Sequence, residues 1–225
     1  PTPTTSAGFD ASIVKGAVNL VGPGKIAIIK STILPGTTKE IQKNNPNTIV
    51  LYSPEFLSEA TAAHDAANPF SNIVGLSIDD EAHRKAAELV HSILPPAKFT
   101  LTCDSTEGEI IKYTHNASGY VQIVLFNMIY DLASKLGADW SKIQAALEAD
   151  PFICNRYSKP VHKSGRGAGG GCFIKDFAAF RSLYGEVVGD ELGKNALLAI
   201  ENKNLNLLKN SGKDGDLVRG VYGDL

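Results

Sequence analysis

The chain has 225 residues, of which 43% are hydrophobic and 20% charged, so its composition is that of an ordinary globular protein and not of a disordered one. Its formal net charge of −2 gives no global electrostatic reason to bind nucleic acid or an anionic membrane. No apolar run approaches the roughly 20 residues that a membrane helix needs, and residues 1–5 lack the basic and apolar regions of a signal peptide. Three widely spaced cysteines suit a reducing compartment rather than a disulfide scaffold, so we expect a cytoplasmic protein with no nucleic-acid and no membrane partner.

Four short apolar runs in the first hundred residues predict β-strands, at residues 25–30, 48–52, 72–77 and 98–102. Helical patterns lie between them at residues 37–44 and 79–93, and the Asp79 carboxylate can cap the second of these helices. Strands that alternate with helices predict a parallel α/β sheet, in which ligands bind at the carboxyl ends of the strands. The polar residues 31–32 and 53–59 follow the first two strands at those positions.

The rest of the chain is predicted to be mostly helical. A long helix is expected over residues 106–136, with N-cap chemistry at Asp104 and Ser105 and a stop at Gly137. About 30 residues at ~1.5 Å each give roughly 45 Å, a length that usually bridges domains or builds a subunit interface. Further helices are expected at residues 139–149, after Cys172, and over residues 190–210. Apolar residues of the long helix recur at three- and four-residue steps, as a buried face requires, and they are Ile110, Tyr113, Ala117, Val121, Val124, Leu125, Met128 and Leu132.

Glycine is unevenly distributed, because seven of the 21 glycines lie between Gly165 and Gly189. Gly165, Gly167 and Gly170 have the G-x-G-x-x-G spacing of a dinucleotide-binding turn, but such a turn follows a strand and opens a helix within a βαβ unit. Residues 156–164 are polar and contain a proline, so we reject that interpretation. We expect instead a flexible loop that forms the approach to Cys172 and whose backbone passes close to another group.

Cys172 has two open interpretations. The amides at the start of a helix favour a thiolate, and Lys175 one turn later would help, which predicts a nucleophile. Phe173, Phe177 and Phe180 are also near in sequence, and they favour a buried structural cysteine.

Two further pairs of side chains could carry chemistry. Glu55 and Glu59 are four residues apart after a strand and could be acid–base carboxylates, or they could serve only in capping and solvation. Lys112 and Asn116 share a helix face and could stabilise an oxyanion, unless Lys112 instead forms a solvated pair with Glu109.

No metal site is expected from the sequence. His64, His83, His91, His115 and His162 show no ligand spacing, and the cysteines are scattered. His115 points about 100° away from Asn116 on the helix, so we interpret it as a surface or packing residue.

The set of motifs resembles the UDP-glucose/GDP-mannose dehydrogenase family. The resembling segments, in chain order, are residues 1–4 (PTPT), 31–37 (STILPGT), 53–59 (SPEFLSE) with its sequel to Pro69, 109–113 (EIIKY) with Asn116, 126–131, 136–139, and 169–176 (GGGCFIKD). The last segment resembles the nucleophile motif of the family. The resemblance implies an α/β fold, with the C-terminal half of a Rossmann-like parallel-sheet NAD domain in residues 1–103. It implies a mainly helical central domain with one long helix in residues 104–225.

The resemblance implies NAD-dependent oxidation of the C6 alcohol of a UDP- or GDP-sugar to a carboxylate, by a homodimer formed through the long helix. The implied catalytic roles are thiohemiacetal and thioester formation at Cys172, oxyanion binding by Lys112 and Asn116, and proton transfer by Glu55, Thr32 and Asp176. The implied cofactor contacts are Thr32, Glu59 and Lys175. The implied substrate contacts are Phe56, Leu57, Lys112, Asn116, Tyr157 and Gly167.

The chain also departs from the family pattern. The first βαβ unit of the NAD domain and the C-terminal nucleotide-binding domain are not in this chain, so we expect an incomplete part that is inactive when isolated. Phe152 stands where the family has an arginine that reaches the substrate of a partner subunit, and Ala168 stands where an aromatic residue is frequent. These departures leave open a catalytically degenerate relative with a structural or dimerisation role. A thiol hydrolase without NAD is disfavoured, because no histidine lies near the motif.

Overall fold

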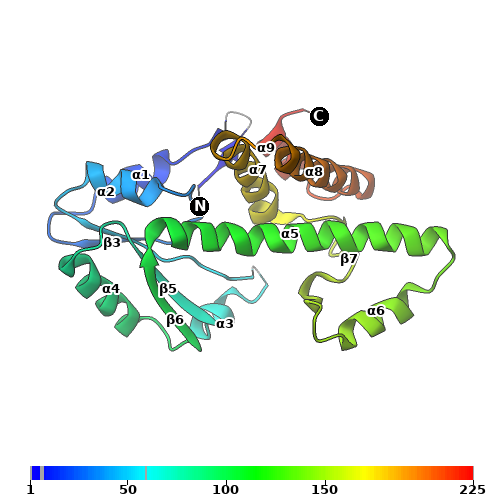
Figure 1. The fold of residues 1–225 in the computed structure, drawn as a ribbon, viewed down its shortest axis with the longest axis horizontal. Helices are drawn as coiled ribbons and strands as arrows, with labels where there is room; N and C mark the ends of the chain where they lie inside the picture. Colours follow the sequence, from blue (N-terminus) through cyan, green and yellow to red (C-terminus); the bar gives the residue numbers. More distant parts are fainter. Residues whose placement is uncertain (1, 6–7, 59, 225) are drawn as a thin grey trace. The chain divides into compact units, whose positions relative to one another are not determined.

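The computed structural model describes residues 2–5, 8–58 and 60–224. The chain divides into two compact units, the first made of residues 1–3 and 9–114 and the second of residues 4–8 and 115–225 (Figure 1). The short strands β1 (Thr4–Thr5) and β2 (Gly8–Phe9) precede the main elements of both units. No helix in the described ranges is long and apolar enough to cross a membrane.

The first unit is built on a sheet of four strands in the order β3-β4-β5-β6, and all four predicted strands are confirmed. These are β3 (Ile26–Ile29), β4 (Ile49–Tyr52), β5 (Ser71–Leu76) and β6 (Phe99–Asp104). The pairs β3/β4 and β5/β6 are parallel, as expected, but β4 and β5 are antiparallel, with Leu51 opposite Leu76. Among the described residues between β4 and β5, the only helix is α3 (Ala62–Ala67), and six residues span only about 9 Å. A parallel pair is usually joined by a crossover helix, and α3 is shorter than such a helix, in keeping with the antiparallel pairing.

Helices cover both faces of this sheet. Successive residues of β4 point to opposite faces, so Val50 and Tyr52 pack in one core cluster while Leu51 packs in another. The first cluster includes Val18 of α1 (Ser12–Asn19) and Ile41 of α2 (Thr37–Asn44). The second cluster includes Ala86, Ala87 and Val90 of α4 (Glu81–Ile93). Figure 1 shows α2 and α4 on opposite sides of the strands. The α/β class is thereby confirmed.

The N-cap of α4 differs from the expected one by a residue. Asp80 Oδ1, not Asp79, accepts the hydrogen bond from the backbone N–H of His83, at 2.8 Å. Asp79 instead forms an exposed ion pair with Arg84 at 2.6 Å. Both residues have the right side chain, and the backbone decides between them, because the cap must adopt the extended conformation that Asp80 has.

The long helix α5 (Ser105–Lys135) is confirmed, and the division between the two units falls within it. Asp104 Oδ1 accepts from the backbone N–H of Thr106 at 2.9 Å, which is the expected cap. Gly137 adopts a positive φ of 70° just after the helix, which is the expected stop.

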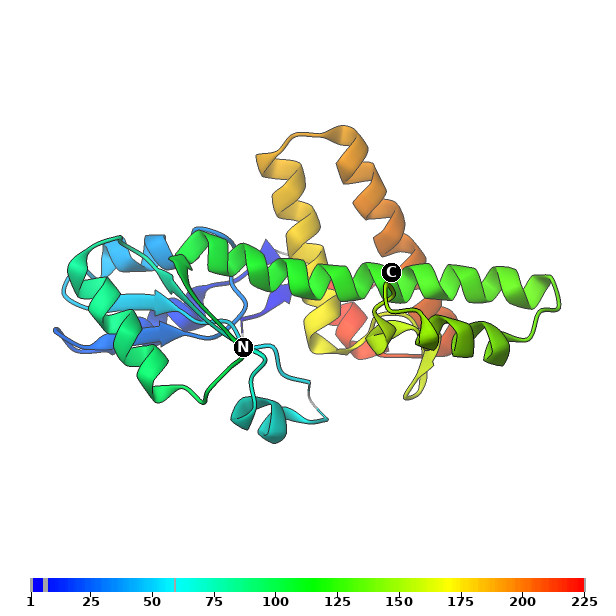
Figure 2. The same ribbon diagram turned by 60° about the horizontal axis from the view of Figure 1, so that its bottom comes forward.

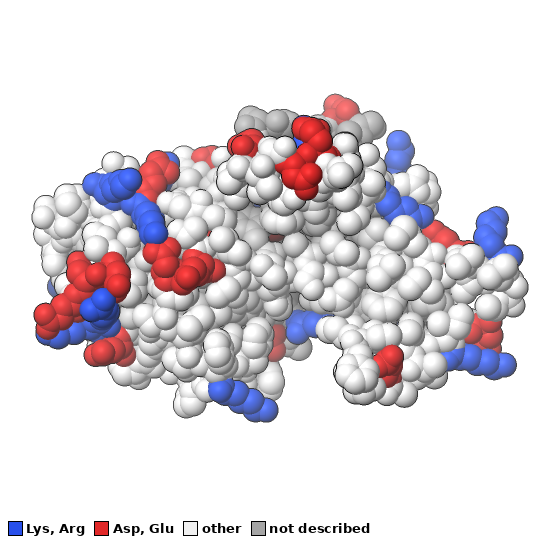
Figure 3. All heavy atoms as spheres, viewed as in Figure 1, with Lys and Arg blue, Asp and Glu red and all other residues white. Residues whose placement is uncertain are grey.

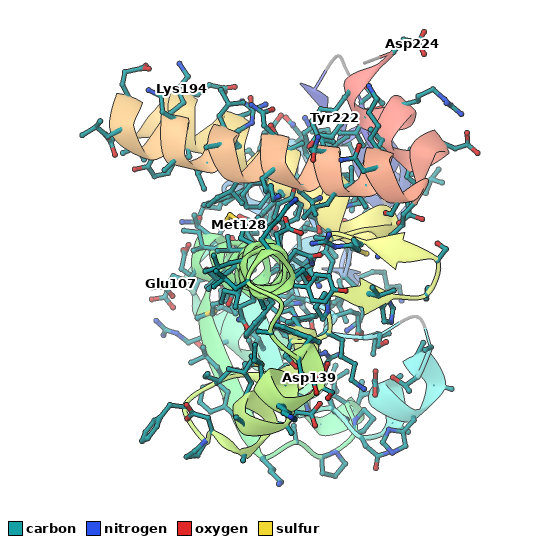
Figure 4. All side chains as sticks on the ribbon, turned by 90° about the vertical axis from the view of Figure 1, so that its right-hand side faces the viewer. Glu107, Met128, Asp139, Lys194, Tyr222 and Asp224 are labelled. Carbon is teal, nitrogen blue, oxygen red and sulfur yellow. The ribbon has the colours of Figure 1, made fainter. Side chains whose placement is uncertain are left out.

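The second unit continues with helices and one small hairpin. Its elements are α6 (Trp140–Ala149), the 3₁₀ turn η1 (Asn155–Tyr157), β7 (Val161–His162), β8 (Gly165–Arg166), α7 (Gly170–Val187), α8 (Glu191–Ser211) and α9 (Gly215–Tyr222). Figure 2 shows α7 and α8 as an antiparallel helical hairpin. The core of the second unit contains Tyr120, Val124, Ala168 and Phe177, and the centres of the stacked Tyr120 and Phe177 rings are 3.9 Å apart. In Figure 4, Tyr222 of α9 lies beside α8, where its hydroxyl donates to Glu201 Oε1 at 2.7 Å.

The expected buried face of α5 is only partly buried. Tyr113 and Val124 are buried, but Ile110, Leu125, Met128 and Leu132 are between 44% and 60% exposed (Figure 4 labels Met128). The apolar spacing therefore reports two different faces of the helix. One face is buried, and the other is open to solvent in the described chain.

Candidate active site

The loops that follow β3 and β4 in the first unit carry several predicted site residues. The Lys30 ammonium lies 2.5 Å from Glu55 Oε1, so the Glu55 carboxylate is in an ion pair. Lys112 Nζ donates to the backbone carbonyl of Glu55 at 2.6 Å and lies 5.3 Å from the centre of the Phe56 ring. The structure therefore brings Glu55 and Phe56 together around Lys112, which is almost fully buried. Leu57, on the same loop, is 41% exposed.

The structure describes less about two other predicted site residues, Thr32 and Glu59. The backbone carbonyl of Thr32 accepts a hydrogen bond from the hydroxyl of the buried Thr2. Glu59 lies outside the described residues, so the proposed Glu55 and Glu59 pair has no described geometry.

Glu109 holds the turn that follows Thr32. Its carboxylate is fully buried and accepts from the Gly36 amide at 2.5 Å, the Thr38 amide at 2.9 Å and the Thr38 hydroxyl at 2.6 Å. Gly36 has a φ of 94°, which favours glycine there. Desolvation raises the pKa of Glu109, although its three hydrogen bonds oppose the rise. The alternative of a solvated pair between Glu109 and Lys112 is therefore wrong, because each of these side chains is buried with another partner.

The second unit contains a buried cluster one turn after the predicted nucleophile. Asn116 Nδ2 donates to Asp176 Oδ2 at 2.6 Å, and the other carboxylate oxygen of Asp176 pairs with Lys175. Asp176 is 2% exposed and Asn116 is 6% exposed. Lys175 thus balances the charge of a buried aspartate, which is a different task from the cofactor contact implied by the resemblance.

Cys172 lies in the first turn of α7, and it is exposed. The alternative of a buried structural cysteine is therefore wrong. The buried residues of α7 include Ile174, Phe177, Ala178 and Ala179, whereas Cys172, in the first turn, is open to solvent. Cys172, Lys175 and Asp176 have i, i+3, i+4 spacing, so they lie along one stripe of α7.

Tyr157 packs on the middle of α5. Its ring meets that of Phe173 edge-on at 5.7 Å, and a Cβ added at Gly119 would lie 2.8 Å from the Tyr157 ring. Gly119 lies in the interior of α5, where a glycine ordinarily only weakens a helix. Its absent side chain in fact makes room for an aromatic residue of the predicted substrate site.

The glycine-rich segment is hydrogen-bonded to side chains from the C-terminal part of its unit. Gly167 has a φ of 93°, and its carbonyl accepts from Lys213 Nζ at 2.9 Å. We expected a flexible approach to Cys172, and the structure shows side chains from α8 and the turn after it bonded to this backbone. These partners were not predictable, since residues 204–214 carry no recognisable motif. The described part of the chain has no group of three or more His, Cys, Asp or Glu side chains that could hold a metal ion.

The charges of the molecule do not single out one region of the face drawn in Figure 3. Lys and Arg are interspersed there with Asp and Glu. This agrees with the formal net charge of −2 and with the many surface ion pairs, such as Lys15–Glu40 and Lys85–Glu81. A screened, mixed surface of this kind supplies little long-range attraction, so specificity must come from local groups.

Comparison with protein families identifies both parts of the chain. The NAD binding domain of the UDP-glucose/GDP-mannose dehydrogenase family matches residues 1–94, and the central domain of the same family matches residues 106–204. UDP-glucose 6-dehydrogenase TuaD of Bacillus subtilis is 31% identical over 195 residues, which are 81% of this chain and 40% of that protein. UDP-glucose 6-dehydrogenase of Rattus norvegicus is 33% identical over 161 residues, which are 68% of this chain and 32% of that protein.

Solved structures agree with this assignment. A UDP-glucose dehydrogenase from Pyrobaculum islandicum is 28% identical, with a TM-score of 0.74 over 89% of this chain and 48% of that one. A UDP-D-ManNAc dehydrogenase from Pyrococcus horikoshii shares the fold with a TM-score of 0.74 at 21% identity, over 94% of this chain and 53% of that one. The chain thus spans about two fifths of the length of the curated TuaD relative and about half that of the solved ones. On the two family matches, which together span most of its length, the chain belongs to the UDP-glucose/GDP-mannose dehydrogenase family.

Proposed function

We propose that this chain forms part of an NAD-dependent dehydrogenase that oxidises the C6 alcohol of a nucleotide sugar to a carboxylate, with Cys172 as the nucleophile. The observation that carries the proposal is the exposed Cys172 in the first turn of α7, one turn before the buried pair of Asn116 and Asp176. Several relatives are named as UDP-glucose 6-dehydrogenases, which supports a UDP-sugar substrate. Residues 1–103 would serve the cofactor and residues 104–225 the nucleophile.

The chemistry of the second unit follows from ordinary thiol reactivity. The first oxidation of the C6 alcohol gives an aldehyde. The Cys172 thiolate adds to the carbon of this aldehyde, and the aldehyde oxygen becomes the oxyanion of a thiohemiacetal. Asn116 would donate to that oxyanion, together with Lys112 one helical turn earlier on α5. When NAD is bound, it supplies the hydride acceptor for both oxidation steps. Asp176 would hold the water that attacks the resulting thioester, after which the C–S bond breaks and releases the carboxylate product and the Cys172 thiolate.

The first unit would supply the remaining roles. Glu55 and Thr32 would transfer protons, Glu59 would lie near the cofactor, and Phe56 and Leu57 would contact the substrate. The ion pair with Lys30 supports a charged Glu55 carboxylate, which is the state that a proton acceptor needs. Tyr157 and Gly167 would contact the substrate from the second unit.

We infer that the first unit by itself holds a dinucleotide poorly. A pyrophosphate binds best to the free amides at the start of a helix. Each helix of eight or more residues that starts in the described part of this unit has a first-turn amide bonded to a carboxylate, from Asp10, Glu109, Asp80 and Asp104 respectively. We therefore expect this chain alone to bind NAD weakly or not at all. A calorimetric Kd tighter than about 10 µM would contradict this expectation.

We also propose a homodimer through α5. Leu125, Met128, Leu132 and Leu136 follow one another at three- and four-residue steps and are between 44% and 75% exposed. Solvent-exposed apolar stripes of this kind mark protein–protein contacts. Sedimentation of the chain and of Leu132→Glu tests the proposal, which predicts a dimer for the first and a monomer for the second. We further propose a cytoplasmic location, because the three cysteines are unpaired.

The function is tested by assaying the complete gene product for NADH formation against a panel of UDP- and GDP-sugars. We expect turnover with at least one nucleotide sugar, and its loss to near background in Cys172→Ser. Cys154→Ser is the matched control, since Cys154 is the other exposed cysteine, and it should retain turnover. A folded protein without turnover on any sugar would favour the alternative, a catalytically degenerate relative with a structural or dimerisation role.

A further inference from the structure

The backbone just before Cys172 is bonded almost residue by residue to the end of α8 and the turn after it. The Arg166 amide donates to Ser211 Oγ at 3.0 Å, and the Gly167 carbonyl accepts from Lys213 Nζ at 2.9 Å. The Gly170 amide, in the first turn of α7, donates to Asp214 Oδ2 at 2.8 Å. We call residues 204–214 the clamp, because each of these bonds uses a side chain from this stretch.

Asn204 is the centre of the clamp. Its side-chain oxygen accepts from the Ala168 amide at 2.6 Å, and its side-chain nitrogen donates to the Ala168 carbonyl at 3.0 Å. Asn204 and Ala168 are both completely buried. A buried backbone residue that has no sheet partner needs such a substitute, and one asparagine satisfies both of its polar groups.

The glycine cluster is explained by the same contact. A Cβ at Gly165 would lie 2.5 Å from Ser211 Oγ, and one at Gly167 would lie 3.0 Å from Asn204 Oδ1. A Cβ at Gly169 would overlap the Asp214 carboxylate and lie 2.8 Å from Lys213 Cε. Every second residue of the segment therefore lacks a side chain on the side where the clamp approaches. A Cβ at Gly171, by contrast, would meet nothing within 4 Å.

Asp214 is held in an uncommon conformation. Its φ of 55° and ψ of 32° lie in the left-handed region, which a non-glycine residue adopts at some cost. Aspartate and asparagine tolerate this region better than alanine does. The conformation persists where surrounding contacts fix it, and here the bond to the first-turn amide of α7 is such a contact.

We propose that Asn204, Lys213 and Asp214 are positioning residues, which fix segment 165–170 and thereby the first turn of α7 that presents Cys172. The inference rests on the proposed function only in taking Cys172 as the reacting group. None of the three residues needs to touch the substrate. They act through the backbone that leads into the nucleophile, some 40 residues away in sequence.

The decisive comparison is Gly169→Ala against Gly171→Ala in the 225-residue chain. Gly169 has extended backbone angles that alanine adopts freely, so its variant displaces the clamp without straining its own backbone. Two readouts are measured in the native protein. One is hydrogen exchange of a peptide that covers residues 165–171. The other is the ratio of Cys172 to Cys154 labelling by a limiting iodoacetamide pulse, with labelling of the partly buried Cys103 reporting any unfolding.

Gly169→Ala should speed exchange in the segment by about tenfold or more, since the opening that permits exchange becomes easier. It should also lower the labelling ratio by about threefold, because a loosened first turn presents fewer ordered amides to the thiolate. Gly171→Ala should match the wild type in both readouts. Equal exchange and equal ratios in the two variants would overturn the inference.

A second pair of variants decides the case if Gly169→Ala unfolds. Asp214→Asn keeps an acceptor for the Gly170 amide and tolerates the left-handed conformation, so it should resemble the wild type. Asp214→Ala keeps neither and should resemble Gly169→Ala. Identical behaviour of these two variants would also overturn the inference. A wild-type chain in which Cys154 labels before Cys172 would count against the proposed nucleophile, and the exchange data would still decide the clamp.

Discussion

Two helix starts, one in each unit, both have backbone amides bonded to a carboxylate, but they differ in how exposed they are. At the start of α2, the Gly36 and Thr38 amides donate to the Glu109 carboxylate, and at the start of α7 the Gly170 amide donates to the Asp214 carboxylate. The helix dipole favours negative charge at both places, although at α2 the burial of Glu109 opposes it and raises the pKa of that carboxyl. The α2 start is closed, since Glu109, Thr37 and Thr38 are buried. The α7 start carries an exposed cysteine.

The difference shows that a carboxylate at a helix start can either occupy the amides and close them off from ligands, or only hold the helix start in position. At α2, one buried side chain takes the amides and a hydroxyl together, so nothing is left for a ligand at Gly36 and Thr38. At α7, the carboxylate bonds to the first residue of the helix, and the exposed thiol follows two residues later. The first arrangement suits a structural role and the second suits a reacting group.

The largest expected effect is on the closed start. Glu109→Leu leaves three donors without an acceptor, two of them on the buried Thr38, so we expect a loss of about 3 kcal/mol or more of unfolding free energy, measured by urea denaturation. Glu107→Gln is the matched control on the same turn, since glutamine can replace glutamate as the partner of the Asp104 amide. It should cost less than about 0.5 kcal/mol. A tolerated Glu109→Leu would show that the α2 start is not sealed by this carboxylate.

The next effect is a difference in thiol reactivity. Burial, with help from Glu107 and Asp104, raises the pKa of Cys103 to about 11, from an ordinary value of 9.0. Two pKa units mean about 100-fold less thiolate at pH 8. Because alkylation requires the thiolate, Cys103 should label about 100-fold more slowly than a cysteine of ordinary pKa.

We expect Cys172 to be the most reactive of the three cysteines at neutral pH. It lies in the first turn of an 18-residue helix, whereas Cys154 precedes only a three-residue 3₁₀ turn. Mass spectrometry after a limiting iodoacetamide pulse measures the order of labelling. Preferential labelling of Cys103 or Cys154 would remove the contrast between the open α7 start and the rest of the molecule.

The smallest effect is a pH dependence of the closed start. Burial raises the pKa of Glu109 above its ordinary value of 4.5, so its contribution to stability is greatest below that value. The contribution is lost as the pH rises through the raised pKa. The unfolding free energy of the wild type, relative to Glu109→Gln, should therefore fall as the pH is raised above 4.5. A relative stability that rises with pH would show that the three hydrogen bonds outweigh burial.

Local signals in the sequence located most of the elements. The four strands, the long helix and its cap at Asp104 were predictable, because apolar periodicity and N-cap chemistry involve residues close in sequence. The antiparallel β4/β5 pair was not predictable, because strand direction depends on the path of the connecting chain. The exposed side of α5 was missed for a related reason, since periodicity does not say whether an apolar face is covered.

The sequence by itself determined the family, the order of the motifs and the position of Cys172 at a helix start. Those properties reside in short runs of residues whose chemistry and spacing can be recognised without a fold. Only the tertiary structure decided that Glu109 is buried against the α2 start, that Asp176 is held by Asn116 and Lys175, and that residues 204–214 grip the glycine segment. Each of these contacts except Lys175–Asp176 joins residues that are more than 30 positions apart, and hydrogen-bond partners at such separations depend on how the helices pack. The glycines showed where a close approach had to occur, and the packing of α8 supplied what approaches.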